Sequence, residues 1–98
     1  MSIVTGIVVC MSLTDEHRNG PIITKWLEDC GYSELNPVDE CGGGSKHPQM
    51  YIFVGGYNYF PNDKFLDFFK ALTWAWPENA VLLLKPEEGP TAIYRPPY

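Results

Sequence analysis

The hydrophobic positions of this chain predict strands that are apolar on both faces. Side chains of a strand alternate between two faces, so a sheet with one face in water carries a polar residue at every second position. Residues 1–13, 50–55 and 80–84 do not follow this rule. The first of these segments carries Ile3, Ile7, Val9 and Met11 on one face and Val4, Val8 and Cys10 on the other. The pattern therefore predicts a sheet that is covered on both sides.

Helical periodicity is found in two further segments. Residues 21–30 repeat apolar positions at helical spacing, and Pro21 suits a first helical turn because its missing N–H is not needed there. A second helix is predicted from a cap at Asn62 to an end by Trp76, since Pro77 disfavours helical geometry in the residue before it. Strands are predicted at residues 3–12, 35–39, 50–59, 80–85 and 91–95, and a polar loop at residues 13–20.

The order of the elements is β-α-β-β-α-β with an extra C-terminal strand, in a single α+β domain of residues 1–98. This order is typical of the ferredoxin-like sandwich, in which both helices lie on one face of an antiparallel sheet. The other face must then be covered by a second copy, a partner, a ligand or the C-terminal tail. The exposed apolar patch is expected to hold Val4, Val8, Tyr51, Phe53 and Leu82 or Leu84.

The composition favours one globular domain, since 45% of the 98 residues are hydrophobic and 19% are charged. The first residues lack the features of a signal peptide, and no apolar run approaches the roughly 20 residues that span a bilayer. The three cysteines, Cys10, Cys30 and Cys41, have no spacing suited to disulfides or zinc. We therefore expect a cytoplasmic protein in which Cys10 and Cys30 are buried thiols.

The formal net charge of −5 is unevenly distributed. No lysine or arginine lies between Lys25 and Lys46, whereas five acidic residues do: Glu28, Asp29, Glu34, Asp39 and Glu40. Such a surface repels nucleic acid and anionic membranes and attracts basic proteins. Glu28 and Asp29 also fall in the last turn of the first predicted helix, where the helix dipole favours cations. We interpret the five residues as a surface for a basic partner protein; the alternative is an ordinary solvated face.

Aromatic residues flank the second predicted helix at both ends. They are Tyr57, Tyr59, Trp74 and Trp76. Tyrosine and tryptophan are enriched at protein interfaces because they bury a large area with few rotatable bonds. Tyr57, Tyr59 and Trp76 are therefore predicted partner-binding residues, and the alternative is that they cover the core beneath the helix.

A glycine-rich loop at residues 41–48 holds the few residues that are suited to chemistry. Its Gly-Gly-Gly-Ser-Lys run differs from a phosphate-binding loop, which needs a longer motif between a strand and a helix. Cys41 and His47, with Asp39 nearby, are too few for a zinc site and too weakly supported for nucleophilic catalysis. We predict no catalytic residue, no metal site, no cofactor and no enzymatic activity.

Two functions fit this sequence. The first is a small acidic protein-binding module that inhibits a partner by occluding it, by analogy with immunity proteins of toxin systems and inhibitors encoded by phage or mobile elements. The second is a ferredoxin-like regulatory domain that binds a small ligand between the open sheet faces of a homodimer. A pocket lined by Tyr51, Phe53 and polar groups would favour the second, and a flat acidic face would favour the first.

Overall fold

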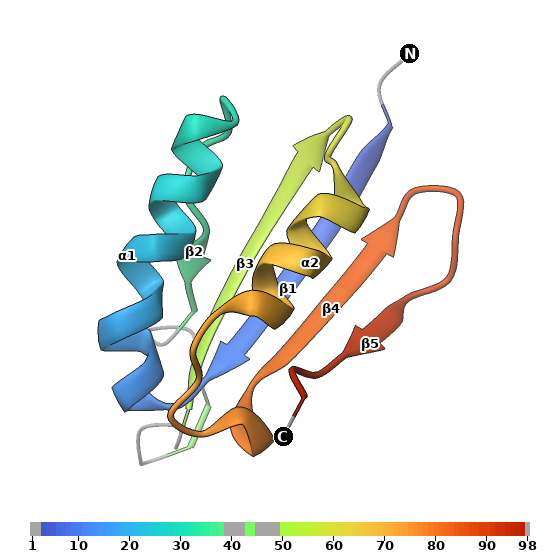
Figure 1. Ribbon diagram of the computed structural model, residues 1–98. Coiled ribbons are helices and arrows are strands. Elements are labelled where there is room, and N and C mark those ends of the chain that lie inside the picture. Colours follow the sequence, from blue (N-terminus) through green and yellow to red (C-terminus); the bar gives the residue numbers. More distant parts are fainter. Residues whose placement is uncertain (1–2, 39–42, 45–49, 98) are drawn as a thin grey trace.

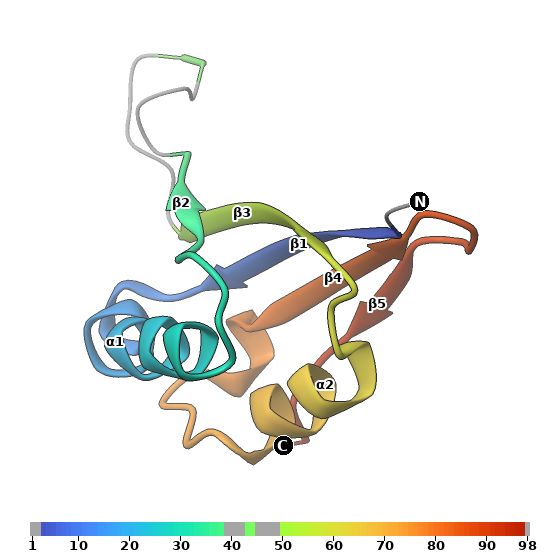
Figure 2. The same ribbon diagram turned by 90° about the horizontal axis from the view of Figure 1, so that it is seen from above.

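The computed structural model describes residues 3–38, 43–44 and 50–97, and it has two layers, a five-stranded antiparallel sheet and two α-helices on one of its faces (Figures 1 and 2). The strands are β1 (Val4–Met11), β2 (Asn36–Pro37), β3 (Tyr51–Asn58), β4 (Val81–Pro86) and β5 (Ala92–Tyr94). The helices are α1 (Leu13–Asp29) and α2 (Asn62–Ala71), and a short 3-10 helix follows at Pro77–Asn79. The predicted α+β architecture with an antiparallel sheet is confirmed.

The strands lie in the order β2-β3-β1-β4-β5, and each neighbouring pair is antiparallel. β1 is the central strand, with β3 on one side and β4 on the other. The register places Val8 of β1 opposite Val54 of β3 and Leu83 of β4. The added strand β5 extends the sheet beyond β4, where Ile93 lies opposite Leu83.

Helix α1 begins eight residues earlier than the sequence pattern predicts, at Leu13 instead of Pro21. The predicted polar loop at residues 13–20 is therefore wrong. Ser12 caps the helix, because its hydroxyl accepts a hydrogen bond from the backbone N–H of Asp15 (3.2 Å). The buried stripe of the first two turns is polar, and consists of Asp15 and Asn19. A search for hydrophobic periodicity does not detect such a stripe.

Helix α2 ends at Ala71, so the predicted end by Trp76 is confirmed, although the helix stops five residues before that limit. The chain turns to an extended conformation at Leu72, with ψ of 150°. The N-cap of α2 differs from the prediction, because Pro61 occupies that position and Asn62 is the first helical residue. Segment 73–76 does not continue the helix. It lies against α1, because the side chains of Asp15 and Asn19 form hydrogen bonds with its backbone.

The core lies between the sheet and the two helices. Its fully buried members come from β1, α1, α2 and β4, and include Val9, Leu27, Phe65, Phe69 and Leu82. Aromatic rings fill the space between the helices. Trp26 of α1 stacks on Phe68 of α2, with ring centroids 5.2 Å apart. These contacts hold α1 and α2 on the same face.

The opposite face of the sheet carries neither helix (Figure 2). Val4 and Val8 point to this face, as predicted. Tyr51 and Phe53 lie opposite Met11 and Val9 on the helix side, so their expected place in the open patch is wrong.

Leu82 and Leu84 of β4 were also expected in the exposed patch. That prediction is wrong, because both are buried in the core. The described part of the C-terminal tail turns to the helix side (Figure 2). There Pro96 is buried, and the Arg95 guanidinium donates a hydrogen bond to the Glu78 carbonyl (3.1 Å).

Candidate functional site

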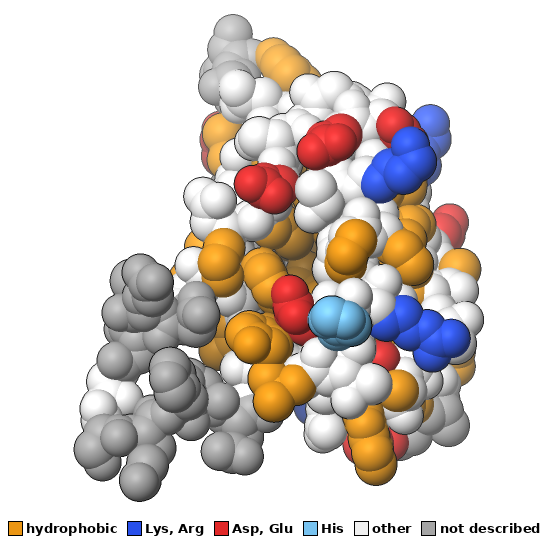
Figure 3. All heavy atoms as spheres, turned by 90° about the vertical axis from the view of Figure 1, so that its left-hand side faces the viewer, with side chains coloured by type: hydrophobic (Ala, Val, Ile, Leu, Met, Phe, Trp, Pro, Cys, Tyr) orange, Lys and Arg blue, Asp and Glu red, His pale blue; other side chains and the backbone are white. Residues whose placement is uncertain are grey.

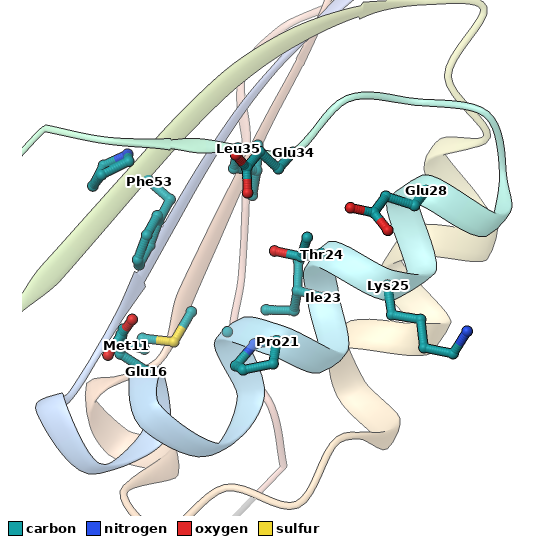
Figure 4. A pocket seen from close by; sticks show the side chains of 12 residues that line it. Met11, Glu16, Pro21, Ile23, Thr24, Lys25, Glu28, Glu34, Leu35 and Phe53 are labelled. Atoms are coloured by element: carbon teal, nitrogen blue, oxygen red, sulfur yellow. The ribbon is translucent and has the colours of Figure 1, made fainter.

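A pocket of about 530 Å3 lies between α1 and the edge of the sheet formed by β2 and β3 (Figure 4). Its floor is apolar and comes from three elements and the segment before β2. Met11 ends β1, Ile23 belongs to α1, Leu35 precedes β2 and Phe53 belongs to β3. Met11, Ile23 and Leu35 are buried and Phe53 is half-buried, so the floor is continuous with the core.

Three carboxylates line the wall of this pocket: Glu16 and Glu28 from α1, and Glu34 from the segment before β2. Figure 4 shows Glu28 and Glu34 directed into the same space from opposite sides, while the Lys25 ammonium group points away. Glu16 lies towards the other end of the pocket. Figure 3, viewed from the side of α1, shows acidic and hydrophobic side chains adjoining on this surface.

Two residues that disfavour helices form part of the α1 wall. Gly20 and Pro21 lie inside the helix and both line the pocket. In a helix interior, glycine costs about 1 kcal/mol and proline about 3 kcal/mol relative to alanine. A Cβ atom at Gly20 would lie 3.6 Å from the Glu16 carboxylate oxygen, which is an ordinary van der Waals contact, so this part of the wall lies directly beside Glu16. A local rule broken where a pocket opens is a feature of functional sites.

The structure brings together two of the five predicted acidic residues, Glu28 and Glu34. Glu28, Asp29 and Glu34 are all exposed, but Asp29 does not line the pocket and instead pairs with Lys25 (3.4 Å). This pairing partly offsets the unfavourable position of Asp29 at the helix C-terminus. Asp39 and Glu40 lie outside the described residues.

Glu16 is a pocket residue that the sequence analysis missed. Glu16, Gly20, Thr24 and Glu28 recur every four residues and all line the pocket. Residues four apart share one face of a helix. This four-residue spacing is visible in the sequence, but it places the residues on one helix face only if the helix begins before residue 16.

The three predicted aromatic residues lie elsewhere, since none of them lines the pocket. Tyr57 is 7% exposed, and its hydroxyl donates a hydrogen bond to the Ser33 carbonyl (2.8 Å). Burial raises the pKa of the Tyr57 phenol, and the negative charge of Glu34 raises it further. Tyr57 therefore offers little contact area to a partner, whereas Tyr59 is 63% and Trp76 52% exposed.

Two of the three thiols, those of Cys10 and Cys30, lie within the described residues. Cys10 is half-buried on the open face, and Cys30 is exposed, so the predicted burial of Cys30 is wrong. Burial raises the pKa of the Cys10 thiol. Within residues 3–38, 43–44 and 50–97, no three His, Cys, Asp or Glu side chains are grouped to hold a metal ion. Cys41 and His47 lie outside the described residues.

No protein-family model matches this chain, and neither a curated protein nor a solved structure is significantly similar to it. In the described part of the chain, no helix is long and apolar enough to cross a membrane.

Proposed function

We propose that this chain is a non-enzymatic protein-binding module that holds a basic segment of a partner protein in the pocket beside α1 and acts by occluding it. The observation that carries this proposal is the combination of an apolar floor with the carboxylates of Glu16, Glu28 and Glu34. Lysine and arginine side chains bury an aliphatic stem and keep a charged head in water. Such side chains would match the floor and the rim of this pocket.

The spread of the carboxylates favours an extended ligand over a single ion. Glu16 and Glu28 are twelve residues apart in α1. A helix rises 1.5 Å per residue, so these positions are separated by roughly 18 Å along its axis. A peptide segment with two or more basic residues spans that distance. Exposed ion pairs contribute only about 0–1 kcal/mol each, so the charges would mainly govern orientation and association rate.

The fold is consistent with this role. We infer that the chain is an extended ferredoxin-like domain, an inference supported by the strand order β2-β3-β1-β4, by the two crossovers through α1 and α2, and by both helices lying on one face. In this arrangement the pocket lies at the β2 edge, where α1 lies over the sheet. A segment bound there would be covered on one side by the helix and on the other by β2.

A titration with a defined probe tests the proposal. The probe is a short fluorescent peptide in which arginine and leucine alternate. The double variant Glu28→Gln/Glu34→Gln should weaken its binding about tenfold, because two carboxylate contacts are lost. The matched control is Asp67→Asn/Glu88→Gln, which removes the same charge from exposed positions outside the pocket and should bind like the unmodified chain.

Capture from a lysate of the source cells extends this test to the natural partner. A protein that is retained by the chain and by the control variant, but not by Glu28→Gln/Glu34→Gln, supports the proposal. If both double variants weaken peptide binding equally, the interaction follows net charge and the pocket is not the binding site.

A small ligand is the second candidate, because about 530 Å3 lies within the usual range of small-molecule sites and Phe53 contributes to the floor. An apolar floor with carboxylates at its rim would also bind an aliphatic diamine. Titration with 1,8-diaminooctane separates the two functions. Saturable diamine binding that depends on Glu28 and Glu34, without peptide binding, would favour a small-molecule receptor.

A further inference from the structure

The open face of the sheet carries a continuous apolar surface across four strands. One row of neighbouring side chains consists of Val54, Val8, Leu83 and Ile93, and a second row of Ile52, Cys10 and Val81. Neighbouring strands are about 4.8 Å apart, so the side chains of a row lie side by side. Ile93 is 66% exposed at the end of the first row. A water-facing antiparallel sheet would carry polar residues at these positions.

This face differs in charge from the rest of the molecule. The chain has 12 acidic and 7 basic residues. Within the described strands, however, the open-face positions include no carboxylate, and the one charged side chain among them is Lys85 near the end of β4. Glu87, just after β4, lies at the margin of this face, since its carboxylate accepts a hydrogen bond from the Val4 N–H (3.1 Å). Two acidic chains could therefore bring the aliphatic rows together with carboxylates at the margin of the rows and not within them. Like charges placed opposite each other at an interface cost several kcal/mol.

We propose that two copies of this chain pair through the open sheet face, sheet against sheet. A second copy presents the same uncharged aliphatic rows, and in a two-fold pair the rows of each copy pack against those of the other. Two facing sheets pack about 10 Å apart with interdigitating side chains. The pocket of each copy lies on the helix side and stays accessible, so this inference does not rest on the proposed binding function.

The size of the face sets the expected strength of the pair. From strand spacing and rise, the sheet covers roughly 400 Å2 per copy and roughly 800 Å2 in a pair. Specific interfaces below about 1,200 Å2 are weak or transient. We therefore expect a reversible dimer that dissociates on dilution.

Light scattering over a dilution series tests this inference. The mass should approach twice the 11.1 kDa of one chain as the concentration rises. Ile93→Glu places a carboxylate in the row at an exposed position of the edge strand, and should hold the mass at 11.1 kDa. The matched control is Ile22→Glu, the same substitution at an isoleucine of α1 that is 45% exposed, which should dimerise normally.

Thiol alkylation gives a second readout at the interface itself. Cys10 lies on the open face, whereas Cys30 is exposed at the C-terminus of α1. Alkylation of Cys10 should slow as the concentration rises, and alkylation of Cys30 should not. A mass of 11.1 kDa at every concentration would overturn the inference. So would a dimer that persists in Ile93→Glu and leaves Cys10 reactive, because another surface would then hold it.

Discussion

Asp15 is the residue on which the connection between α1 and the segment after α2 depends. It is fully buried, and its carboxylate accepts hydrogen bonds from the Ala75 N–H (2.7 Å), the Trp76 N–H (3.0 Å) and the Ser12 hydroxyl (3.0 Å). Asn19, one turn later, donates to the Thr73 carbonyl (3.0 Å). This pair ties the first two turns of α1 to segment 73–76.

The first prediction concerns the charge of this carboxylate. In Asp15→Asn the amide must present an N–H to one of these donors, so at least one charge-assisted bond is lost. We expect the free energy of unfolding to fall by about 2–3 kcal/mol, measured by chemical denaturation. Asp67→Asn, the same change at an exposed position of α2, should stay within about 0.5 kcal/mol. Equal effects would mean that Asp15 does not fix segment 73–76.

The second prediction concerns the raised pKa of Tyr57. A neutral phenol is favoured in the folded state, so its contribution to stability is present below the ordinary pKa of 10.0 and is lost as pH rises through the higher folded value. Near neutral pH, Tyr57→Phe should be less stable by about 1 kcal/mol, because the Ser33 carbonyl loses its donor. Above pH 10.0 the two stability curves should converge. Cys10 titrates in both proteins, so its effect cancels. A constant difference at all pH values would contradict this prediction.

At the scale of elements, the strands were predicted well because their signal is local. β1, β3 and β4 are long apolar runs, and their sequence positions agree with the predicted ranges within a few residues. The first half of α1 was not predicted, because Gly20 and Pro21 are typical helix boundaries and the buried residues before them, Asp15 and Asn19, are polar. The prediction of which β3 side chains face the helices was also wrong. Both faces of β3 are apolar, so only the register with β1 shows that Phe53 faces the helices.

The candidate site was predictable only in part, because the sequence shows local patterns but not how the elements pack. Glu28 and Glu34 are predictable from their charge, which is visible in the sequence. The apolar floor and the contribution of Glu16 depend on how α1 packs against the β2 edge. That packing depends on tertiary contacts that residue patterns do not specify.

The third prediction tests the close contact that holds the β2 edge. A Cβ atom at Gly55 would lie 2.7 Å from the Leu35 side chain and 2.9 Å from the Tyr57 hydroxyl, so both would have to move. Gly55→Ala should therefore cost about 1–3 kcal/mol of unfolding free energy. The neighbouring Gly56→Ala is a matched control, since its nearest contact would be Val4 at 3.8 Å. Similar denaturation curves for the two variants would show that Leu35 can be displaced at no cost.

At the scale of the whole molecule, the two proposed surfaces lie on different sides of the sheet. The acidic pocket is on the helix side, and the uncharged apolar rows are on the open side. A dimer formed through the open side would present two pockets to one partner, which raises the apparent affinity when both can be engaged.

The two surfaces should respond to salt in opposite directions, and this is the fourth prediction. Salt screens the attraction between the pocket and a basic peptide, so peptide binding should weaken as ionic strength rises. The dimer joins two chains that each carry a formal charge of −5, so screening their repulsion should strengthen it. Peptide anisotropy and light scattering on the same samples, over one salt series, measure both equilibria. A dimer that dissociates in high salt would mean that charged contacts hold it, and the aliphatic rows would then not be its interface.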